Sequence, residues 1–494
     1  MTSPASAPRA TGLPPRGLVL LLVGLTALRL GVAGLAGLVD DEAYYRLWSL
    51  HLAFGYLDHA PMVAWVIAAG RALAGEGSLG VRLFSPLATA VGSLMLWRAV
   101  ALCEGRETAT RAAVWFNAMV LIGAGSVLIT PDSPSVFFWG ATLWALAERT
   151  ASRDPRWWLV VGVTAGLGLL SKYSVPFLGV GIGLWLMSTK ETRRWFADAR
   201  LWLGAAIALA LFAPVVLWNA EHGWVSFAKQ FGRATVEEWR PEKLGELIGV
   251  QLLLIGVPMV PFLVLGIRKV LVRRDPAGLL PLMTGIPFVA YLLFHSLHAG
   301  VEGNWPAPLY PSFAWLAAIG AADLAAAGAT WGPRLRRLRA AVAPFGFGLV
   351  ALLYLHVLVP LVVLPANRDP TAQMRGWEAF DRDLAALGER VGARVFGVVN
   401  YTLAAKLAVG LGAEAVAPFD ERERWVDLPV RDPRRVCAPI LYVDRAGRDP
   451  TAALAAHWRS VTPLGTLARR AGGKIVEDHP VWRLADPVDC DPAG

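Results

Sequence analysis

Residues 17–45 read GLVLLLVGLTALRLGVAGLAGLVDDEAYY, so a long apolar stretch ends directly in Asp40, Asp41 and Glu42. A helix needs roughly 17 to 25 apolar residues to cross a bilayer, and this stretch supplies them. Acidic and aromatic side chains at its end would lie at a membrane surface, where charge is costly and is usually retained for a task. The stretch therefore predicts a membrane helix that leads into a functional site.

The composition indicates a protein that crosses the membrane many times. Of its 494 residues, 55% are hydrophobic and only 17% are charged, which is too little polar surface to cover a soluble globule of this size. The net charge of +9 does not indicate nucleic-acid binding, because Lys and Arg stand in short clusters between apolar stretches. Residues 1–16 show no cleavage site, so we expect an uncleaved anchor.

About eleven stretches are apolar and long enough to be candidate spans, with an error of about two. The stretches that begin at 134, 157 and 173 are short, and 157–188 is also compatible with one broken helix. The expected spans are 17–39, 81–102, 112–129, 134–148, 157–171, 173–188, 201–218, 246–267, 279–297, 306–327 and 341–364.

The basic clusters predict the orientation of these spans, because cytoplasmic connections carry an excess of Lys and Arg. Alternate connections hold such clusters, whereas the acidic run falls in the other, outer set. All the unusual chemistry is thus expected on the outer face, together with the tail from about residue 365. The clusters that mark the inner face are Arg106 and Arg111; Arg149, Arg153 and Arg156; Lys190, Arg193, Arg194 and Arg200; Arg268, Lys269, Arg273 and Arg274; and Arg334, Arg336, Arg337 and Arg339.

The tail has a different composition, with many charges and short strand-like runs at 394–400 and 440–444. Residues 401–410 lie between these runs and have helical spacing that ends at a glycine. We therefore predict a small α/β soluble domain at 365–494 after a membrane domain at 1–364.

Two of the three cysteines, Cys437 and Cys490, lie in this tail. An oxidising compartment would allow them to pair. Two cysteines alone do not decide between a disulfide and two free thiols.

The first outer loop, residues 40–80, carries two patterns of helical spacing. They predict two amphipathic helices that lie in the membrane interface. Asp41 stands at the start of the first helix, so one interpretation is helix capping, worth about 1 kcal/mol. Capping needs one carboxylate, however, and the chain supplies three together. The residues with helical spacing are Tyr44, Leu47, Trp48, His51, Leu52 and Phe54, and then Met62, Trp65, Val66, Ala69 and Leu73.

Two segments of this loop resemble the first periplasmic loop of glycosyltransferase family 39. That family includes the protein O-mannosyltransferases and the bacterial aminoarabinose transferase of lipid A. The resemblance covers the membrane part, residues 1–330, and the tail matches in placement only. The segments are Asp41-Glu42-Ala43-Tyr44-Tyr45 and Gly55-Tyr56-Leu57-Asp58-His59-Ala60-Pro61-Met62-Val63-Ala64-Trp65, with support from Thr130-Pro131-Asp132-Ser133-Pro134, from GLGLLSKY at 166–173 and from Glu302-Gly303-Asn304-Trp305-Pro306-Ala307-Pro308.

The resemblance implies a C-type (GT-C) membrane glycosyltransferase, which is a mainly α polytopic bundle of the bacterial inner membrane with a periplasmic active site and C-terminal domain. Such an enzyme passes a sugar from a polyprenyl-phosphate donor to lipid A, another glycolipid, a glycan or a protein, with inversion. Asp41 would be the general base or its close partner, and Glu42 and Asp58 are further catalytic candidates. The chemistry agrees, because an alkyl hydroxyl needs a positioned base and a leaving phosphate needs cations or hydrogen-bond donors.

The candidate contacts to the donor phosphate are His59, Lys172, Arg233, Tyr44 and Tyr45. Lys172 has no acidic neighbour in sequence, which favours a residue that waits for an anion over interfacial snorkelling. Relatives often carry lysine where this chain has His59. An unperturbed imidazole is mostly neutral at pH 7, so His59 is expected to donate a hydrogen bond or to ligate a metal. For Arg233 a solvated loop is an equal alternative.

A third group of residues is expected to line the pocket for the sugar or the acceptor. Ordinary helix-start chemistry is the alternative for Asp132, and an interfacial anchor is the alternative for Trp305. Oxygen and imidazole ligands suit divalent ions, but no spacing enforces a metal site, so the cofactor is open. The pocket candidates are Asp132, His298, Glu302, Asn304 and Trp305, and the metal candidates are Asp41, Asp132 and His298.

A transporter or lipid flippase is the main alternative, because it would also be polytopic with buried charges. Transporters tend to have related halves and broken helices at the midplane, and this chain has no evident halves. A non-catalytic scaffold would leave the acidic cluster unexplained. The sugar and the acceptor are not identified by the sequence.

Overall fold

The computed structural model describes residues 12–232, 238–322, 324, 328–362 and 368–490. The chain forms two compact units. The helical unit comprises Met1–Gly31, Asp58–Val63 and Leu83–Leu353, and the mixed unit comprises Val32–Leu57, Ala64–Arg82 and Tyr354–Gly494. Most of the first loop therefore folds with the C-terminal part of the chain. The domain boundary expected after residue 364 falls within 363–367, outside the described residues.

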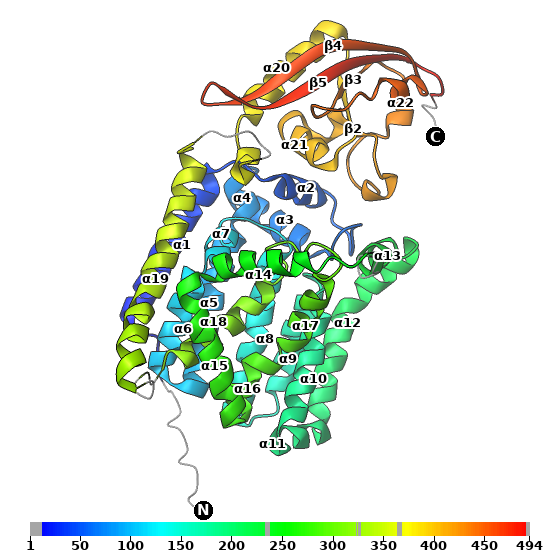
Figure 1. Ribbon diagram of the computed structural model, residues 1–494. Coiled ribbons are helices and arrows are strands. Elements are labelled where there is room, and N and C mark those ends of the chain that lie inside the picture. The colour runs from blue at the N-terminus through cyan, green and yellow to red at the C-terminus, as the bar shows by residue number, and fades with distance from the viewer. Residues whose placement is uncertain (1–11, 233–237, 323, 325–327, 363–367, 491–494) are drawn as a thin grey trace, which may run out of the picture. The chain divides into compact units, whose positions relative to one another are not determined.

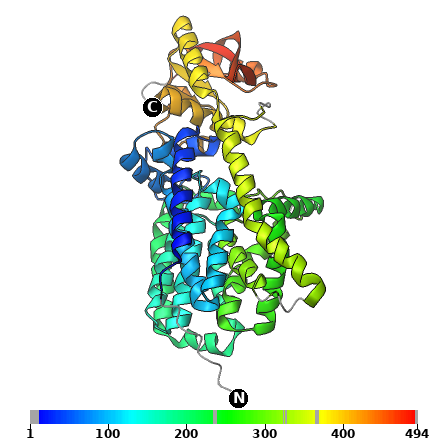
Figure 2. The same ribbon diagram turned by 90° about the vertical axis from the view of Figure 1, so that its left-hand side faces the viewer.

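The helical unit is a bundle of helices that run side by side (Figures 1 and 2). The ends of its first and last helices belong to the mixed unit. The helices are α1 (Arg16–Leu35), α5 (Phe84–Glu104), α6 (Arg106–Ala118), α7 (Val120–Gly125), α8 (Asp132–Ser152), α9 (Trp157–Leu169), α10 (Pro176–Ser188), α11 (Lys190–Arg193), α12 (Ala199–Glu221), α13 (Val225–Gly232), α14 (Glu242–Ile255), α15 (Val260–Arg273), α16 (Pro276–Met283), α17 (Ile286–His295), α18 (Tyr310–Gly320) and α19 (Gly328–Leu358), with 3-10 turns η1 (Arg194–Ala197), η2 (Val257–Met259) and η3 (Ala307–Leu309).

Glycines allow two pairs of these helices to pack closely. A Cβ atom at Gly162 in α9 would lie 2.3 Å from the carbonyl oxygen of Gly204 in α12. A Cβ atom at Gly266 in α15 would lie within 1.8 Å of the carbonyl oxygen of Leu316 in α18. Small residues at such contacts let helix backbones approach each other in a membrane, where van der Waals packing holds helices together.

Five helices among the described residues are long and apolar enough to cross a membrane. They are Arg16–Leu35, Ser78–Glu104, Ala199–Glu221, Pro276–His295 and Gly332–Leu358, and a bent pair can count as a sixth span. Several other expected spans correspond to shorter helices, and α9 and α10 are separate helices. The expected total of about eleven spans is therefore not confirmed.

The expected span at 246–267 is interrupted. α14 and the stretch Val257–Arg273 meet at a bend of 90°. The break lies at Gly256, whose φ of 97° favours glycine, and is followed by Pro258, which lacks a backbone N–H. The expected span at 112–129 is also interrupted, because Met119 between α6 and α7 has an extended backbone.

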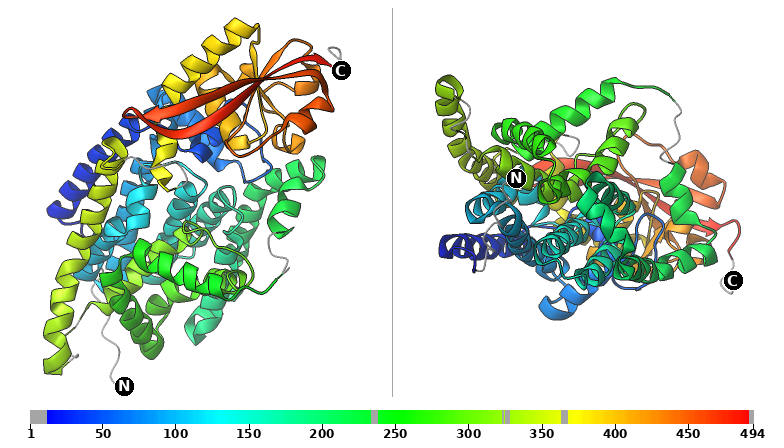
Figure 3. Two further views of the ribbon diagram at one scale, coloured as in Figure 1. Left: turned by 45° about the horizontal axis from the view of Figure 1, so that its top comes forward. Right: turned by 90° about the horizontal axis from the view of Figure 1, so that it is seen from below.

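The mixed unit contains a five-stranded sheet with the strand order β2-β1-β3-β5-β4. β1 (Val395–Val398) pairs in parallel with β2 (Val416–Pro418) and β3 (Ile440–Val443), and β3 pairs antiparallel with β5 (Lys474–Pro487). β4 (Trp458–Ala471) and β5 form a long hairpin, and β4 contacts α20 (Trp377–Val391), as Figure 3 shows. The tail is thus an α/β fold, as predicted.

The short elements of the tail follow the predicted positions. β1 and β3 lie in the predicted strand runs, and α21 (Tyr401–Leu411) lies at the predicted helix. Asn400 begins α21, because its side chain accepts the backbone N–H groups of Thr402 and Leu403. The remaining short elements are η5 (Pro370–Met374), η6 (Ala413–Ala415), η7 (Arg422–Arg424), η8 (Pro433–Arg435) and α22 (Thr451–Ala455).

The two predicted helices of the first loop are present as α2 (Asp40–Trp48) and α3 (Met62–Ala74), followed by the short α4 (Ser78–Arg82). α2 packs against α21 within the mixed unit. The ring of Trp48 at the end of α2 is fully buried and stacks on Tyr56 at 4.3 Å between ring centres. Burial of this aromatic face fixes the first turn of α2, which carries the acidic run.

The two tail cysteines are bonded to each other. The Cys437–Cys490 disulfide joins positions separated by 53 residues. It ties the end of the chain after β5 to the loop before β3.

Candidate active site

Glu42 is the carboxylate that holds the start of α2. It is fully buried, and both of its oxygens bind the guanidinium of Arg82, at 2.8 and 2.5 Å. Its Oε2 also accepts the backbone N–H of Val39 at 2.9 Å. The capping function considered for Asp41 is therefore carried by Glu42, in the third position of the helix.

Arg82 was not recognised in the sequence. It is completely buried and also donates to the carbonyl oxygens of Ala33 and Ala36, at 3.0 and 2.8 Å. A buried guanidinium needs a carboxylate and several acceptors to offset desolvation. The signal in the sequence was an arginine at the start of the apolar stretch 81–102.

Asp40 lies among cations of the C-terminal segment. Its Oδ1 is 3.7 Å from Nζ of Lys406, and its Oδ2 is 3.5 Å from Arg445. Lys406 is buried and donates to the carbonyl oxygens of Leu38 and Gln373. Burial lowers the pKa of Lys406 to about 8, although Asp40 and Glu42 oppose the shift. These contacts position the chain that enters α2.

Asp41 is the exposed member of the acidic run. Its Oδ1 accepts a hydrogen bond from the hydroxyl of Tyr401 at 3.4 Å. Tyr401 is the first residue of α21, whose start is fixed by Asn400. Of the three adjacent acids, Asp41 is the most exposed, Asp40 is partly buried and Glu42 is buried.

Tyr44 and Tyr45 are buried in an aromatic cluster beside Asp41. The ring of Tyr44 lies 5.2 Å from Tyr401 and 6.0 Å from Trp425. The guanidinium of Arg424 lies over the rings of Tyr401 and Tyr44, at 4.3 and 5.4 Å, and donates to the Tyr44 hydroxyl at 3.3 Å. Cation–π contacts of this kind fix a buried arginine.

In the helical unit, three of the predicted residues meet at the start of α8. Nζ of Lys172 binds Oδ1 of Asp132 at 2.5 Å, and the side-chain amide of Asn304 donates to Oδ2 at 2.7 Å. Asp132 is 9% exposed, so these partners compensate a buried carboxylate. Lys172, which has no acidic neighbour in sequence, thus has one in space.

Asp58 is the next acid of the first-loop motif. Its Oδ1 lies 2.9 Å from Nζ of Lys229 in α13, and its carbonyl oxygen accepts from the side chain of Gln230. His59 beside it is partly buried. Arg233 lies outside the described residues.

The other pocket candidates surround a histidine cluster at the end of α17. The rings of His295 and His298 lie 4.7 Å apart, and His295 lies 5.2 Å from Trp305. Both histidines are buried, whereas Glu302 is exposed. The backbone N–H of Trp305 donates to the carbonyl oxygen of Glu302, which closes a tight turn.

No group of three or more His, Cys, Asp or Glu side chains is placed to hold a metal ion within the described ranges. Asp132 and His298 belong to the helical unit and Asp41 to the mixed unit. Metal binding by Asp41, Asp132 or His298 therefore stays a prediction.

The family model for dolichyl-phosphate-mannose-protein mannosyltransferase matches residues 58–218. The lipid A galacturonosyltransferase RgtD of Rhizobium johnstonii is 25% identical over 411 residues, which cover 80% of this chain and 82% of that protein. The chain is therefore similar in sequence to membrane glycosyltransferases of the GT-C class.

Two further comparisons give similar proteins. An undecaprenyl phosphate-α-4-amino-4-deoxy-L-arabinose arabinosyl transferase of Pseudomonas fluorescens is 29% identical over 173 residues, 32% of this chain and 30% of that protein. The crystal structure of ArnT from Cupriavidus metallidurans bound to undecaprenyl phosphate has the same fold, with a TM-score of 0.66 and 17% identity over 95% of this chain and 99% of that one. The similarity in sequence and in fold favours a membrane glycosyltransferase over the transporter alternative.

Proposed function

We propose that this enzyme transfers a sugar from a polyprenyl-phosphate-linked donor to a glycolipid acceptor of the lipid A type, at the periplasmic face of the bacterial inner membrane. The exposed carboxylate of Asp41, held by Tyr401 while Asp40 and Glu42 are engaged elsewhere, carries the proposal. The similarity to a lipid A galacturonosyltransferase over most of both chains favours this acceptor class over a protein.

Asp41 acts as the general base in this proposal. Its carboxylate takes the proton of the acceptor hydroxyl while the hydroxyl oxygen forms a bond to the anomeric carbon. The bond from that carbon to the phosphate oxygen breaks at the same time, and polyprenyl phosphate leaves with the electron pair. A single displacement of this kind inverts the anomeric carbon.

The leaving phosphate needs positive charge or hydrogen-bond donors. We assign this function to Lys172, whose ammonium is positioned by Asp132, and to the imidazole of His59. Asn304, with Glu302, His298 and Trp305, is assigned to the sugar pocket. Glu42, Tyr44 and Tyr45 are assigned to holding the base in place, because all three are buried in packing contacts. The assignments of Asp58 as a catalytic residue and of Arg233 as a phosphate contact rest on the sequence alone.

The periplasmic orientation is supported by the disulfide, because disulfides persist in oxidising compartments. The basic clusters on alternate connections favour the same orientation. A cysteine introduced at the exposed Asp383 of α20 should react with a membrane-impermeant maleimide in intact spheroplasts. Reaction only after the membrane is permeabilised would place this residue on the cytoplasmic side and contradict the proposed orientation.

A reconstituted transfer assay tests the function. The purified protein in liposomes, given undecaprenyl-phosphate-linked sugars and lipid A, should release undecaprenyl phosphate and form a glycosylated lipid A of inverted anomeric configuration. Movement of intact donor between leaflets without release of undecaprenyl phosphate would identify a flippase instead.

A further inference from the structure

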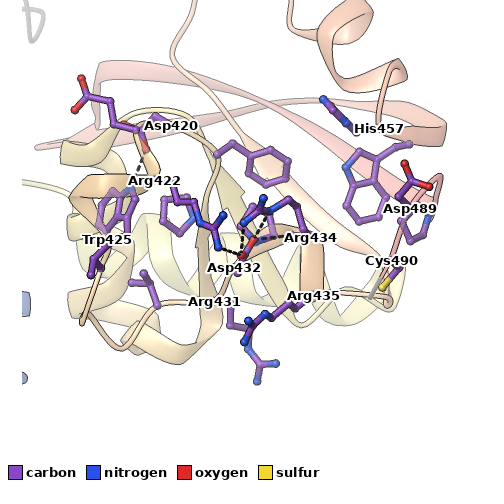
Figure 4. Close-up of a pocket in the computed structure, with 18 of the residues that line it drawn as sticks. Asp420, Arg422, Trp425, Arg431, Asp432, Arg434, Arg435, His457, Asp489 and Cys490 are labelled. Atoms are coloured by element: carbon purple, nitrogen blue, oxygen red, sulfur yellow. Dashed lines mark hydrogen bonds and ion pairs between the residues drawn. The ribbon is translucent and has the colours of Figure 1, made fainter. Parts of the chain in front are cut away.

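The mixed unit contains an open cleft that the proposed function does not use. The end of β2 and the residues after it form one part of its lining, and His457, Trp458 and Cys490 form another. Figure 4 shows Trp425 on one side of the cleft and His457 and Cys490 on the other. Ligands of open α/β sheets bind outside the carboxyl ends of parallel strands, and the cleft lies at the carboxyl end of β2.

The lining combines an aromatic floor with a charged rim. Phe419, Trp425 and Trp458 contribute the rings, and the last two are almost completely buried. Arg431 and Arg435 are exposed at the rim. Polar groups at the rim suit a sugar, because sugar hydroxyls donate and accept hydrogen bonds to carboxylates and guanidinium groups.

Most lining acids are already engaged by the protein. Asp432 binds Arg434 at 2.8 Å and lies 3.8 Å from Arg422, as Figure 4 shows. Asp420 accepts the indole N–H of Trp425 at 3.1 Å. These contacts leave the carboxylates less able to repel an anionic ligand.

Two arginines on the rim differ from the others. Within the described part of the chain, the guanidinium of Arg435 has no carboxylate partner, and Nε of Arg431 donates to the carbonyl oxygen of Glu414, so its terminal nitrogens are left for a ligand. The planar fork of arginine matches phosphate and carboxylate groups. The rim therefore fits an acidic substituent on a glycan.

The cleft is linked to Asp41 by two sets of contacts. Trp425 lines the cleft and packs edge-on against Tyr44 at 6.0 Å. Glu421 also lines it and binds Arg424 at 2.5 Å, and Arg424 lies over the ring of Tyr401. A ligand in the cleft would therefore contact Trp425 and Glu421, which pack against or bind the neighbours of the proposed base.

We propose that this cleft binds the glycan of the acceptor, with a phosphate or carboxylate of that glycan on Arg431 and Arg435. The assignment to the acceptor rests on the proposed function. The Cys437–Cys490 disulfide fixes one wall of the cleft, because Cys490 is a lining residue. The substrate class is an acidic glycolipid headgroup.

A titration tests binding without depending on activity. The full-length protein in detergent is titrated calorimetrically with a bisphosphorylated glucosamine disaccharide that lacks acyl chains, and with the same disaccharide without phosphates. We expect the phosphorylated probe to bind more tightly, and the variant R431A/R435A to bind it at least 10-fold more weakly. The control is Arg382→Ala, an exposed arginine of α20 outside the cleft. Equal affinity in the double variant, or no saturable binding to the wild type, would overturn the proposal.

A kinetic measurement tests the assignment to the acceptor. R431A/R435A should raise KM for the acceptor at least 10-fold and leave kcat and the KM for the donor unchanged. An unchanged acceptor KM would overturn the assignment. If the wild type bound the disaccharide but transferred no sugar, the proposed function and the acceptor assignment would both fail, whereas the glycan site would stand on the titration.

Discussion

The hydroxyl of Tyr401 donates a hydrogen bond to Oδ1 of Asp41 at 3.4 Å, across 360 residues of sequence. The first turn of α2 and the first turn of α21 therefore meet within one compact unit. The proposed base is positioned by a helix of the C-terminal segment, and that segment is part of the site's framework.

Removal of this hydroxyl should weaken catalysis and leave the fold intact. A hydrogen bond to a charged group contributes about 1.5 to 3 kcal/mol when buried and less at an exposed site, so Tyr401→Phe should lower kcat by about 3- to 10-fold. The control is Tyr442→Phe, which removes a similar bond to Asp444, 3.3 Å long, in the same unit. Equal kcat in both variants would show that the Tyr401 hydroxyl is not a positioning group.

The buried pair of Arg82 and Glu42 should be important for stability. Arg82→Met leaves an uncompensated buried carboxylate, which typically costs about 3 to 5 kcal/mol of the free energy of unfolding. The exposed Glu76, which pairs with Arg46 and Arg71, provides the control, since surface pairs contribute about 0 to 1 kcal/mol. Thermal unfolding in detergent measures both. Similar melting temperatures for Arg82→Met and Glu76→Gln would contradict the account.

Lys406 predicts a dependence of stability on pH. Its pKa is lowered by burial to about 8, below the ordinary value of about 10.4 for lysine in the unfolded chain. Between these values the unfolded state binds more protons than the folded state, so the free energy of unfolding rises with pH over this range. Below about pH 8 the destabilisation by the buried ammonium of Lys406 is complete. Lys406→Met should abolish the rise in melting temperature between pH 8 and 10. An unchanged rise in the variant would exclude Lys406 as its source.

Deprotonation of Lys406 should lower activity, although it raises stability. Above about pH 8 the ammonium that lies 3.7 Å from Asp40 loses its charge. The turnover rate of the wild type should therefore fall above about pH 8, whereas the melting temperature should rise over the same range.

A single and a double variant can separate the structural role of Lys172 from its proposed role in donor binding. Among the described residues, Lys172→Met leaves the buried carboxylate of Asp132 with the side-chain amide of Asn304 as its hydrogen-bond partner. Both stability and donor affinity should therefore fall, the latter by at least about 10-fold if a charge-assisted bond to phosphate is lost. The double variant Lys172→Met/Asp132→Asn removes both charges and should recover the melting temperature but not the KM for the donor. Recovery of both would reduce Lys172 to a structural partner of Asp132.

Local patterns in the sequence predicted the elements that depend on local spacing. The two helices of the first loop, the strands at 395–398 and 440–443, and the helix that begins at Tyr401 all lie where period and capping residues indicate. The long hairpin of β4 and β5 was not recognised, because its strands carry charged residues on an exposed face. The adjacent Gly472 and Gly473, both with positive φ, are the turn signal that could have found it.

The contacts around the site could not be predicted in the same way. Glu42 and Arg82 are 40 residues apart, as are Asp132 and Lys172, and Asn304 lies 172 residues from Asp132. Such pairs are decided by tertiary packing, since a buried charge takes whichever partner the fold supplies. Residue type made Glu42, Asp132, Lys172 and Asn304 candidates, but it did not identify Arg82. Only the fold distinguishes exposed Asp41 from buried Glu42.

The measurement that tests the central claim most directly is sugar transfer by the purified Asp41→Asn variant in liposomes, with Glu76→Gln as the first-loop control. The account predicts a loss of about 100- to 10,000-fold in kcat, the usual contribution of a general base, with donor binding and melting temperature unchanged. Turnover of Asp41→Asn within about threefold of the wild type, far less than a general base contributes, would contradict it.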